Sequence, residues 1–183
     1  MEKMVYVFLA DDFEESEALT TVDVLRRANQ TVKMVSITGD LVVRGAHHIS
    51  VLADKLFEDC KFENVKALVL PGGMPGAETL GKHKGLLDLL AKHQDSETVI
   101  AAICAAPMVL GEAGLLKGKK AVAYPGFESY LKGASVQNSA VVVDGRMLTG
   151  KGPAAALPFA LALAELLAGK AVADGVKQGM CVE

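Results

Sequence analysis

The chain has 183 residues, a length that suits one domain spanning residues 1–183, and 51% of them are hydrophobic, which is enough for a sizeable core. Its net charge of −3 is spread without a basic cluster, so we expect no nucleic-acid-binding surface. No apolar stretch is long enough to cross a bilayer, and the N-terminus lacks the pattern of a signal peptide. We therefore expect a cytoplasmic protein without a membrane partner.

In the first half of the chain, short apolar runs alternate with an amphipathic segment. The pattern predicts a buried strand at Val5–Ala10, an amphipathic helix at Glu15–Asn29 and a second strand at Val32–Thr38. Leu41–Ala53 alternates poorly and is predicted to form a short β-excursion. A third buried strand, Ala67–Leu70, is closed by a proline and two glycines.

The second half repeats this alternation. Helical segments are predicted near Ala77–Leu80 and Gly85–His93, then a fourth strand at Thr98–Ile103 that runs directly into a helix ending at Ala113. Ala121–Tyr124 is predicted as another strand. Asp144-Gly145 centres a hairpin over Val141–Thr149, with a turn of type I′ character. The chain closes with a long helix from Gly152-Pro153 to about Ala168 and a last helix at Ala171–Gly179.

This order, with few aromatic residues, no Trp and 18 glycines, predicts an α/β fold with a mostly parallel sheet covered by helices on both faces. In doubly wound folds, ligands bind beyond the carboxyl ends of the strands. Three chemically loaded turns are expected there: Asp11–Glu17, Pro71–Gly76 and Cys104–Pro107.

Cys104 lies where an apolar strand meets a helix, with alanines two residues away on either side. This pattern predicts a nucleophile elbow, which needs small residues at those positions. A helix N-terminus favours a thiolate, so we expect a lowered pKa for the Cys104 thiol. The alternative is a small buried hydrophobic residue. Cys60 and Cys181 lack such surroundings, and the spacing of the three cysteines matches no metal motif, so free thiols in a reducing compartment are expected.

Gly72 and Gly73 let the backbone approach a ligand closely, and their amides are candidates for an oxyanion site. The pattern matches no phosphate-binding motif, and an ordinary turn is the alternative. In the acidic turn, helix capping explains any single carboxylate. A carboxyl group that meets the thiol must be largely neutral, because an ionised one would raise the thiol pKa.

Together, these turns resemble the PfpI/ThiJ superfamily, which includes the Parkinsonism-associated deglycase. The resemblance spans nearly the whole chain and rests on the acidic turn ending at Glu17 and on four further segments: Val22–Ala28, Leu70–Gly73, Ala101–Pro107 and Thr149–Pro153. It implies a flavodoxin-like three-layer sandwich and a homodimer. It also implies that Cys104 is the nucleophile, that Glu17 is its protonated partner and that the amides of Gly73 and Ala105 bind an oxyanion.

One position departs from the family pattern. Many relatives carry a His after the strand that follows the elbow helix, and Tyr124 stands there in this chain. No Cys–His dyad can therefore be assigned, which weakens a peptidase interpretation. Tyr124 and Gly72 are candidate pocket residues. His47 is another, near where some relatives carry an Arg that lines the pocket.

The resemblance implies glyoxalase or deglycase chemistry on an α-oxoaldehyde or a glycated adduct, without a metal or organic cofactor. Two alternatives stay open. An exposed reactive thiol beside a hydrogen-bond donor also suits an oxidation sensor or chaperone. A cysteine peptidase would need a His close to Cys104 in space.

Overall fold

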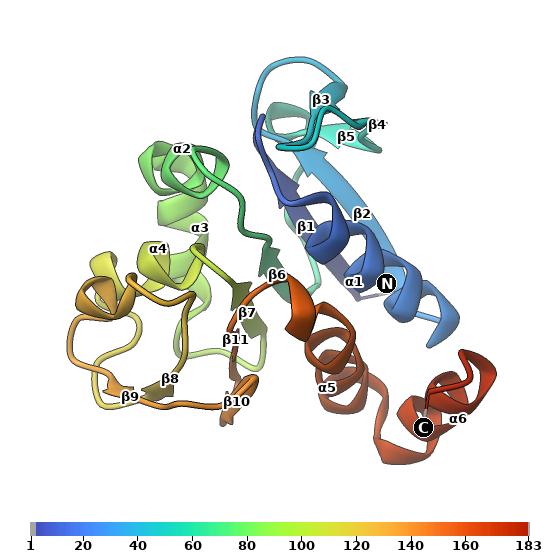
Figure 1. Ribbon diagram of the computed structural model, residues 1–183. Coiled ribbons are helices and arrows are strands. Elements are labelled where there is room, and N and C mark those ends of the chain that lie inside the picture. The colour runs from blue at the N-terminus through green and yellow to red at the C-terminus, as the bar shows by residue number, and fades with distance from the viewer. Residues whose placement is uncertain (1–2, 183) are drawn as a thin grey trace.

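The computed structural model describes residues 3–182 and has a seven-stranded sheet at its centre (Figure 1). All neighbouring strands are parallel except β10 and β11. The predicted α/β fold with a mostly parallel sheet is therefore confirmed. In spatial order, the strands are β10 (Val141–Asp144), β11 (Met147–Gly150), β7 (Val99–Ile103), β6 (Val65–Leu70), β1 (Met4–Leu9), β2 (Thr31–Ser36) and β5 (Lys55–Leu56).

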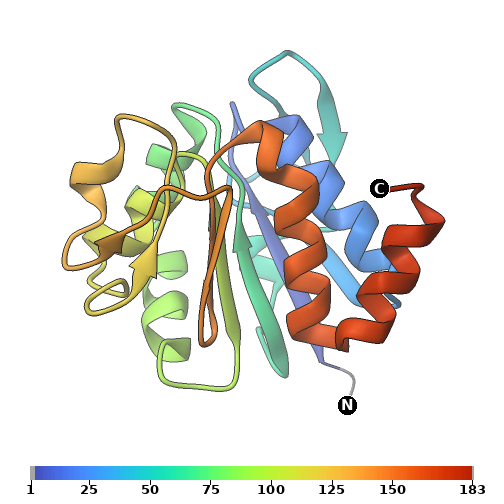
Figure 2. The same ribbon diagram turned by 60° about the horizontal axis from the view of Figure 1, so that its bottom comes forward.

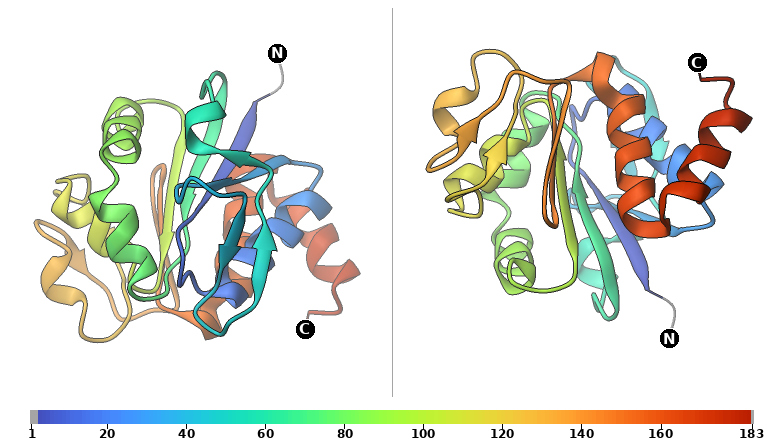
Figure 3. Two further views of the ribbon diagram at one scale, coloured as in Figure 1. Left: turned by 90° about the horizontal axis from the view of Figure 1, so that it is seen from above. Right: turned by 90° about the horizontal axis from the view of Figure 1, so that it is seen from below.

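Helices cover both faces of this sheet, as the end-on views of Figure 3 show. One layer contains α1 (Glu15–Arg27) and α5 (Ala156–Ala168), with α6 (Lys170–Gly179) packed on α5. The opposite layer contains α2 (Gly76–Lys82), α3 (Lys84–His93) and α4 (Pro107–Glu112), and Figure 2 shows the two groups on either side of the strands. No helix within residues 3–182 has the length and apolar character needed to span a membrane.

The alternation along β1 explains the two layers. Val5, Val7 and Leu9 belong to the core that includes α1 and α5. Tyr6 and Phe8, which point the other way, belong to the core that includes α2, α3 and α4. Since successive side chains of a strand face opposite sides, a strand buried on both faces must be apolar at nearly every position.

The order of the strands places the candidate site. The chain leaves β1 for β2 on one side and later returns to β6 on the other side of β1. The sheet therefore has its topological switch point between β1 and β6, where ligands bind in this class of fold. The turns that follow β1, β6 and β7 meet at this point, and they are the three turns that the sequence singles out.

Several predicted elements differ in the structure. The β-excursion forms a separate hairpin of β3 (Val42–Arg44) and β4 (Ser50–Leu52), followed by the short edge strand β5. The hairpin at β10 and β11 is confirmed, but only the first of its two central residues, Gly145, has a positive φ. That is the pattern of a type II′ turn, so the type I′ prediction is wrong.

The strand predicted at Ala121–Tyr124 is also largely wrong. Only β8 (Lys120–Ala121) forms, and it pairs with β9 (Ser135–Val136) outside the main sheet. The amide of Val122 instead donates to Oγ1 of Thr149, and the amide of Tyr124 donates to the carbonyl of Cys104. Val122 and Tyr124 therefore donate their backbone hydrogen bonds to β11 and to Cys104 instead of pairing with a strand.

The helices at the ends of the site begin later than predicted. Three residues separate β7 from α4, which starts only at Pro107 and ends at Glu112. The long closing helix is preceded by a 3₁₀ turn at Pro153–Ala155, and further 3₁₀ turns lie at Phe57–Asp59 and Glu128–Tyr130. α6 matches its prediction within one residue.

Candidate active site

Cys104 occupies a strained turn between β7 and α4. Its φ of 66° is in the left-handed region that residues with a side chain rarely adopt, so the predicted nucleophile elbow is present. Its amide donates to the carbonyl of Gly150 (2.9 Å), and its own carbonyl accepts from Tyr124 (2.8 Å). Ala102 and Ala106 are fully buried, as the crowding around an elbow requires. Cys104 itself keeps only 9% of its surface exposed, so the expected exposed thiol belongs to a residue that is almost completely buried.

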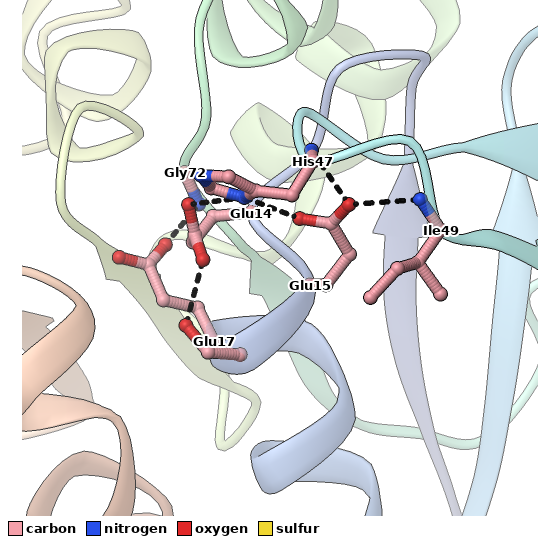
Figure 4. Close-up of polar contacts among 7 residues, drawn as sticks. Glu14, Glu15, Glu17, His47, Ile49 and Gly72 are labelled. Atoms are coloured by element: carbon pink, nitrogen blue, oxygen red, sulfur yellow. Dashed lines mark hydrogen bonds and ion pairs between the residues drawn. The ribbon is translucent and has the colours of Figure 1, made fainter.

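Glu17 comes from the first turn of α1 and is completely buried. Its Oε2 accepts a hydrogen bond from the amide of Gly72 at 2.8 Å (Figure 4). The other oxygen, Oε1, is buried and makes no regular hydrogen bond within residues 3–182. The Cys104 thiol interacts with the Glu17 carboxyl group. A proton can therefore be exchanged between the sulfur and this carboxyl group.

The two glycines of the turn after β6 are required by space. A Cβ on Gly72 would lie 2.6 Å from Cβ of Cys104 and 2.8 Å from Oε2 of Glu17. Gly73 has a φ of 90°, and a Cβ there would collide with the backbone of the acidic turn. Glycine at these positions lets the backbone of the β6 turn lie directly against the side chains of the other two turns.

Backbone amides also surround the sulfur. The N–H groups of Gly73 and Ala105 both donate toward Sγ of Cys104. They come from two different turns, one after β6 and one within the elbow. A negative charge on the sulfur, or on an oxygen bonded next to it, would meet two donors that are already in position.

Burial raises the pKa of Glu17 to about 7. The charge of Glu14 adds to this rise, while the hydrogen bonds from Gly72 and from the Cys104 thiol oppose it. Removal of a carboxylate from water disfavours its charged form, and here that effect exceeds the stabilisation by its donors. A substantial fraction of Glu17 is therefore protonated at neutral pH, in keeping with the expectation of a largely neutral partner.

The thiol behaves differently from the expectation. Burial, followed by the charge of Glu17, raises the pKa of Cys104 to about 12, against the opposite effect of the Ala105 and Gly73 amides. The predicted lowering is thus wrong for a site in which Glu17 is ionised. α4 begins three residues beyond the sulfur and has only six residues, so its dipole adds little. Two neighbouring anions are unfavourable in a buried site, and between pH 7 and 12 the pair keeps one proton.

Glu15 has a separate task beside the pair. Its buried carboxylate accepts from the amides of His47 (2.8 Å) and Ile49 (3.3 Å), and Oε2 lies 2.9 Å from Nδ1 of His47 (Figure 4). Burial alone would raise the pKa of Glu15, but these hydrogen bonds prevail and lower it. The hydrogen bond to Glu15, with the charge of Glu14, raises the pKa of His47. Glu15 therefore anchors the loop between β3 and β4 to α1.

Glu14, Glu15 and His47 also bring three atoms of metal-ligand type within 4.8 Å of one another. Both oxygens of Glu15 already accept hydrogen bonds from the loop, so the hydrogen bonds account for this arrangement without an ion. His47 is mostly exposed and makes no hydrogen bond to Cys104 within residues 3–182.

The remaining histidines are engaged elsewhere. His48 contacts Arg44, His83 caps the start of α3 and His93 hydrogen-bonds Thr98. Within the described part of the chain, no histidine therefore hydrogen-bonds Cys104. Tyr124, by contrast, is tied to the nucleophile through its backbone, and 45% of its surface is exposed.

The sequence does not predict the role of Glu15, because nothing in its local pattern shows that it anchors a distant loop. Tyr124, a predicted pocket residue, lines a pocket of about 290 Å³ together with Gly152 and Pro153, whereas Gly72 and His47, the other two predicted pocket residues, are not part of its lining. The rest of its lining consists of Pro125, Ala140, Lys151, Ala154 and Ala155.

Comparison with known proteins now places the chain among relatives. The profile of the DJ-1/PfpI family matches residues 3–166, which include all three turns of the site. The chain belongs to the DJ-1/PfpI family. This confirms the family that the turns indicate, since the motifs and the elbow fall within the matched residues.

Individual DJ-1 proteins agree with this assignment. Protein dj-1beta of Drosophila melanogaster is 36% identical over 184 residues, covering 100% of this chain and 98% of the fly protein. Protein DJ-1 homolog B of Arabidopsis thaliana is 38% identical over 167 residues, or 91% of this chain, but these make up only 38% of the plant protein. The chain thus spans well under half of that relative and nearly all of the fly one.

Solved DJ-1 structures share the fold closely. The crystal structure of Drosophila melanogaster DJ-1beta superposes with a TM-score of 0.95 at 36% identity and covers 100% of both chains. A structure described as oxidised Toxoplasma gondii DJ-1 gives a TM-score of 0.94 at 38% identity, with 98% of each chain covered. The three-layer architecture is therefore that of DJ-1/PfpI proteins.

The spatial requirement at Gly72 gives a first prediction. In Gly72→Ala, the new Cβ must displace Cβ of Cys104, which is fixed by the elbow, so we expect a loss of about 1–3 kcal/mol in the free energy of unfolding. Urea denaturation followed by circular dichroism measures this loss. Gly175→Ala in α6 is the matched control: nothing lies within 4 Å of its Cβ, and it should gain up to about 1 kcal/mol. Equal stabilities of the two variants would contradict the packing described.

The buried carboxyl group gives a second prediction, on stability against pH. The pKa of Glu17 is about 7 in the folded protein against an ordinary value of 4.5, so the folded state holds a proton that the unfolded state releases. Stability should therefore fall as pH rises from about 4.5 to about 7. Glu17→Gln lacks this loss and should gain about 3 kcal/mol relative to wild type between pH 4 and pH 8. Unfolding curves at pH 4 and pH 8 measure this gain in the free energy of unfolding, with Glu78→Gln, at an exposed carboxylate, as the control. Parallel dependences of stability on pH for wild type and Glu17→Gln would refute the prediction.

Proposed function

We propose that the chain is a cysteine-dependent glyoxalase or deglycase that acts on α-oxoaldehydes or their adducts without a cofactor. The observation that supports it is the buried pair of Cys104 and Glu17, which keeps one proton and lies under two backbone amides. This arrangement provides a nucleophile, a proton carrier and two hydrogen-bond donors in one site.

In the first step, the sulfur of Cys104 attacks the aldehyde carbon of the α-oxoaldehyde. Glu17, with a pKa of about 7, accepts the thiol proton, so that the sulfur need never exist as a free thiolate next to a second anion. The aldehyde oxygen becomes an alkoxide, which the amides of Gly73 and Ala105 stabilise and which then takes the proton from Glu17. The product of this step is a hemithioacetal.

In the second step, Glu17 removes the hydrogen from the former aldehyde carbon as a proton, and a proton is delivered to the neighbouring ketone carbon. The hydroxyl proton of the hemithioacetal moves to the former ketone oxygen, so that the former aldehyde carbon becomes the thioester carbonyl. The result is a thioester between Cys104 and a 2-hydroxy acid. Water hydrolyses the thioester, returning the thiol. The sum is R–CO–CHO + H₂O → R–CH(OH)–COOH, with no external oxidant or reductant. The interaction between the Cys104 thiol and the Glu17 carboxyl group favours this role, because the thiol proton can move to the carboxylate along it.

Glycated adducts fit the same site. A hemiaminal or hemithioacetal carries the former aldehyde carbon bonded to an amine or a thiol, and attack by Cys104 would displace that group. The products are then the same hydroxy acid and the freed amine or thiol.

The direct test is lactate formation from methylglyoxal without added glutathione. Cys104→Ala should abolish turnover, and Glu17→Gln should lower kcat/KM by about 10²–10⁴-fold, as expected for a lost general acid–base. In the wild type, kcat/KM should rise as pH passes about 7, because Glu17 must first lose its proton in order to accept that of the thiol. Cys181→Ala, at an exposed thiol, is the matched control and should match wild type. Lack of turnover by the wild type, or turnover that survives Cys104→Ala, would rule the proposal out.

A second candidate function is an oxidation sensor or chaperone that uses an oxidisable Cys104. Its support is the sulfur of Cys104 with its two amide donors, which suit the oxygens of a sulfinic acid. Each of two hydrogen peroxide molecules would transfer one oxygen atom to the sulfur and release the other as water. Stoichiometric formation of the sulfinic acid at Cys104 in mass spectrometry, in a protein that turns over no α-oxoaldehyde, would favour this candidate over the enzyme.

A cysteine peptidase has the least support. Such an enzyme needs a His close to the thiol, and within residues 3–182 the histidines are bonded elsewhere.

The three cysteines are all free, which supports a location in the reducing cytoplasm.

We also propose that the protein is a homodimer. The β3–β4 hairpin exposes Val42, Ile49 and Leu52, each by more than half, and such a group of apolar side chains favours self-association. The proposal puts this hairpin at the interface.

Light scattering of the purified protein tests the dimer. Leu52→Glu, at a residue that is 67% exposed, should convert a dimer to a monomer because a charge would be buried on association. Val136→Glu, at a comparably exposed residue of β9, should leave the dimer intact. A monomeric wild type, or a dimer that tolerates Leu52→Glu, would contradict the proposed interface.

A further inference from the structure

The pocket next to Tyr124 is apolar. Tyr124 and Pro125 form one wall, and the start of the closing helical segment, Gly152–Ala155, forms another. Lys151 is the one charged residue among those that line it, and its Nζ is bonded to Oδ1 of Asn138 at 2.9 Å. The pocket volume is about 290 Å³.

Each wall is continuous with a segment that hydrogen-bonds to the backbone of Cys104. The carbonyl of Cys104 accepts from the amide of Tyr124, and its amide donates to Gly150, two residues before Gly152. The space between the walls is narrow at this end, since a Cβ on Gly152 would lie 3.1 Å from the Tyr124 ring. Glu17 and Gly72 approach Cys104 from the turns after β1 and β6, so the catalytic groups and the pocket come from different segments around the same residue.

The size of the pocket exceeds what a methyl group needs. A methyl group is close in size to a water molecule, which takes up about 30 Å³ in the liquid. A small substituent would therefore leave most of the 290 Å³ unfilled, whereas a ring or a branched alkyl group would contact the proline, alanine and tyrosine walls.

We infer that this pocket receives the apolar substituent of the substrate, and that the chain prefers α-oxoaldehydes bearing an aromatic ring or a branched alkyl group next to the ketone. The inference rests on the proposed function. Tyr124 and Ala154 are then specificity-determining residues, because they border the space that distinguishes a large substituent from a methyl group.

Turnover of phenylglyoxal and methylglyoxal tests the preference. Ala154 is exposed and lines the pocket, so Ala154→Phe fills it with little disturbance of the core. We expect the ratio of kcat/KM for phenylglyoxal to that for methylglyoxal to fall by about tenfold in this variant, in line with the lost apolar burial. Ala171→Phe, at an exposed alanine of α6, is the control and should keep the wild-type ratio. An unchanged ratio in Ala154→Phe would overturn the inference.

Alkylation of Cys104 separates a failure of the pocket from a failure of the proposed enzyme. Bromoacetone and 2-bromoacetophenone differ only by a methyl or a phenyl group beside the ketone, and both alkylate a thiol with loss of bromide. The rate ratio of the two at Cys104, measured by peptide mapping, should favour the phenyl reagent and should lose about tenfold in Ala154→Phe. The ratios at Cys60 and Cys181 in the same samples should stay constant. A wild type that turns over neither aldehyde but shows this change would keep the pocket and refute the enzyme; equal ratios at Cys104 in both proteins would refute the pocket.

Discussion

The site depends on holding two acids, a thiol and a carboxyl group, next to each other in a space that excludes water. Burial raises the pKa of Glu17 to about 7, and burial followed by the charge of Glu17 raises the pKa of Cys104 to about 12. The pair therefore retains at least one proton across the physiological range. The surrounding structure serves to keep this pair buried and aligned.

Three separate turns must meet for that arrangement to exist. α1 carries Glu17 into the core, the turn after β6 supplies amides without side chains, and the elbow after β7 presents the sulfur. The parallel register of β1, β6 and β7 brings their carboxyl ends together. Gly72 makes the contact possible, because any larger residue would push Cys104 and Glu17 apart.

Local patterns in the sequence are enough to predict the strands that carry the site and the elbow at Cys104, whereas the role of Glu17 is implied only by the resemblance to the family. Those features depend on apolar runs and on small residues next to a nucleophile, which can be seen in a few adjacent letters. The raised pKa of the thiol could not be predicted in this way, since it depends on burial and on a charge from a distant segment. The same holds for Glu15, whose partners His47 and Ile49 lie more than thirty residues away. The strand prediction for Ala121–Tyr124 is wrong because the backbone partners of this segment, Thr149 and Cys104, are fixed only by the tertiary fold.

The left-handed conformation of Cys104 has a consequence for how this sequence can vary. A residue with a side chain costs about 1–3 kcal/mol in such a conformation, whereas glycine adopts it freely. Glycine would therefore relieve the backbone strain at this position and remove the sulfur of the proposed nucleophile. At this residue, the amino acid that would best stabilise the fold is not the one that supplies the reactive sulfur. A chain selected for stability alone would therefore tend to replace Cys104 with glycine.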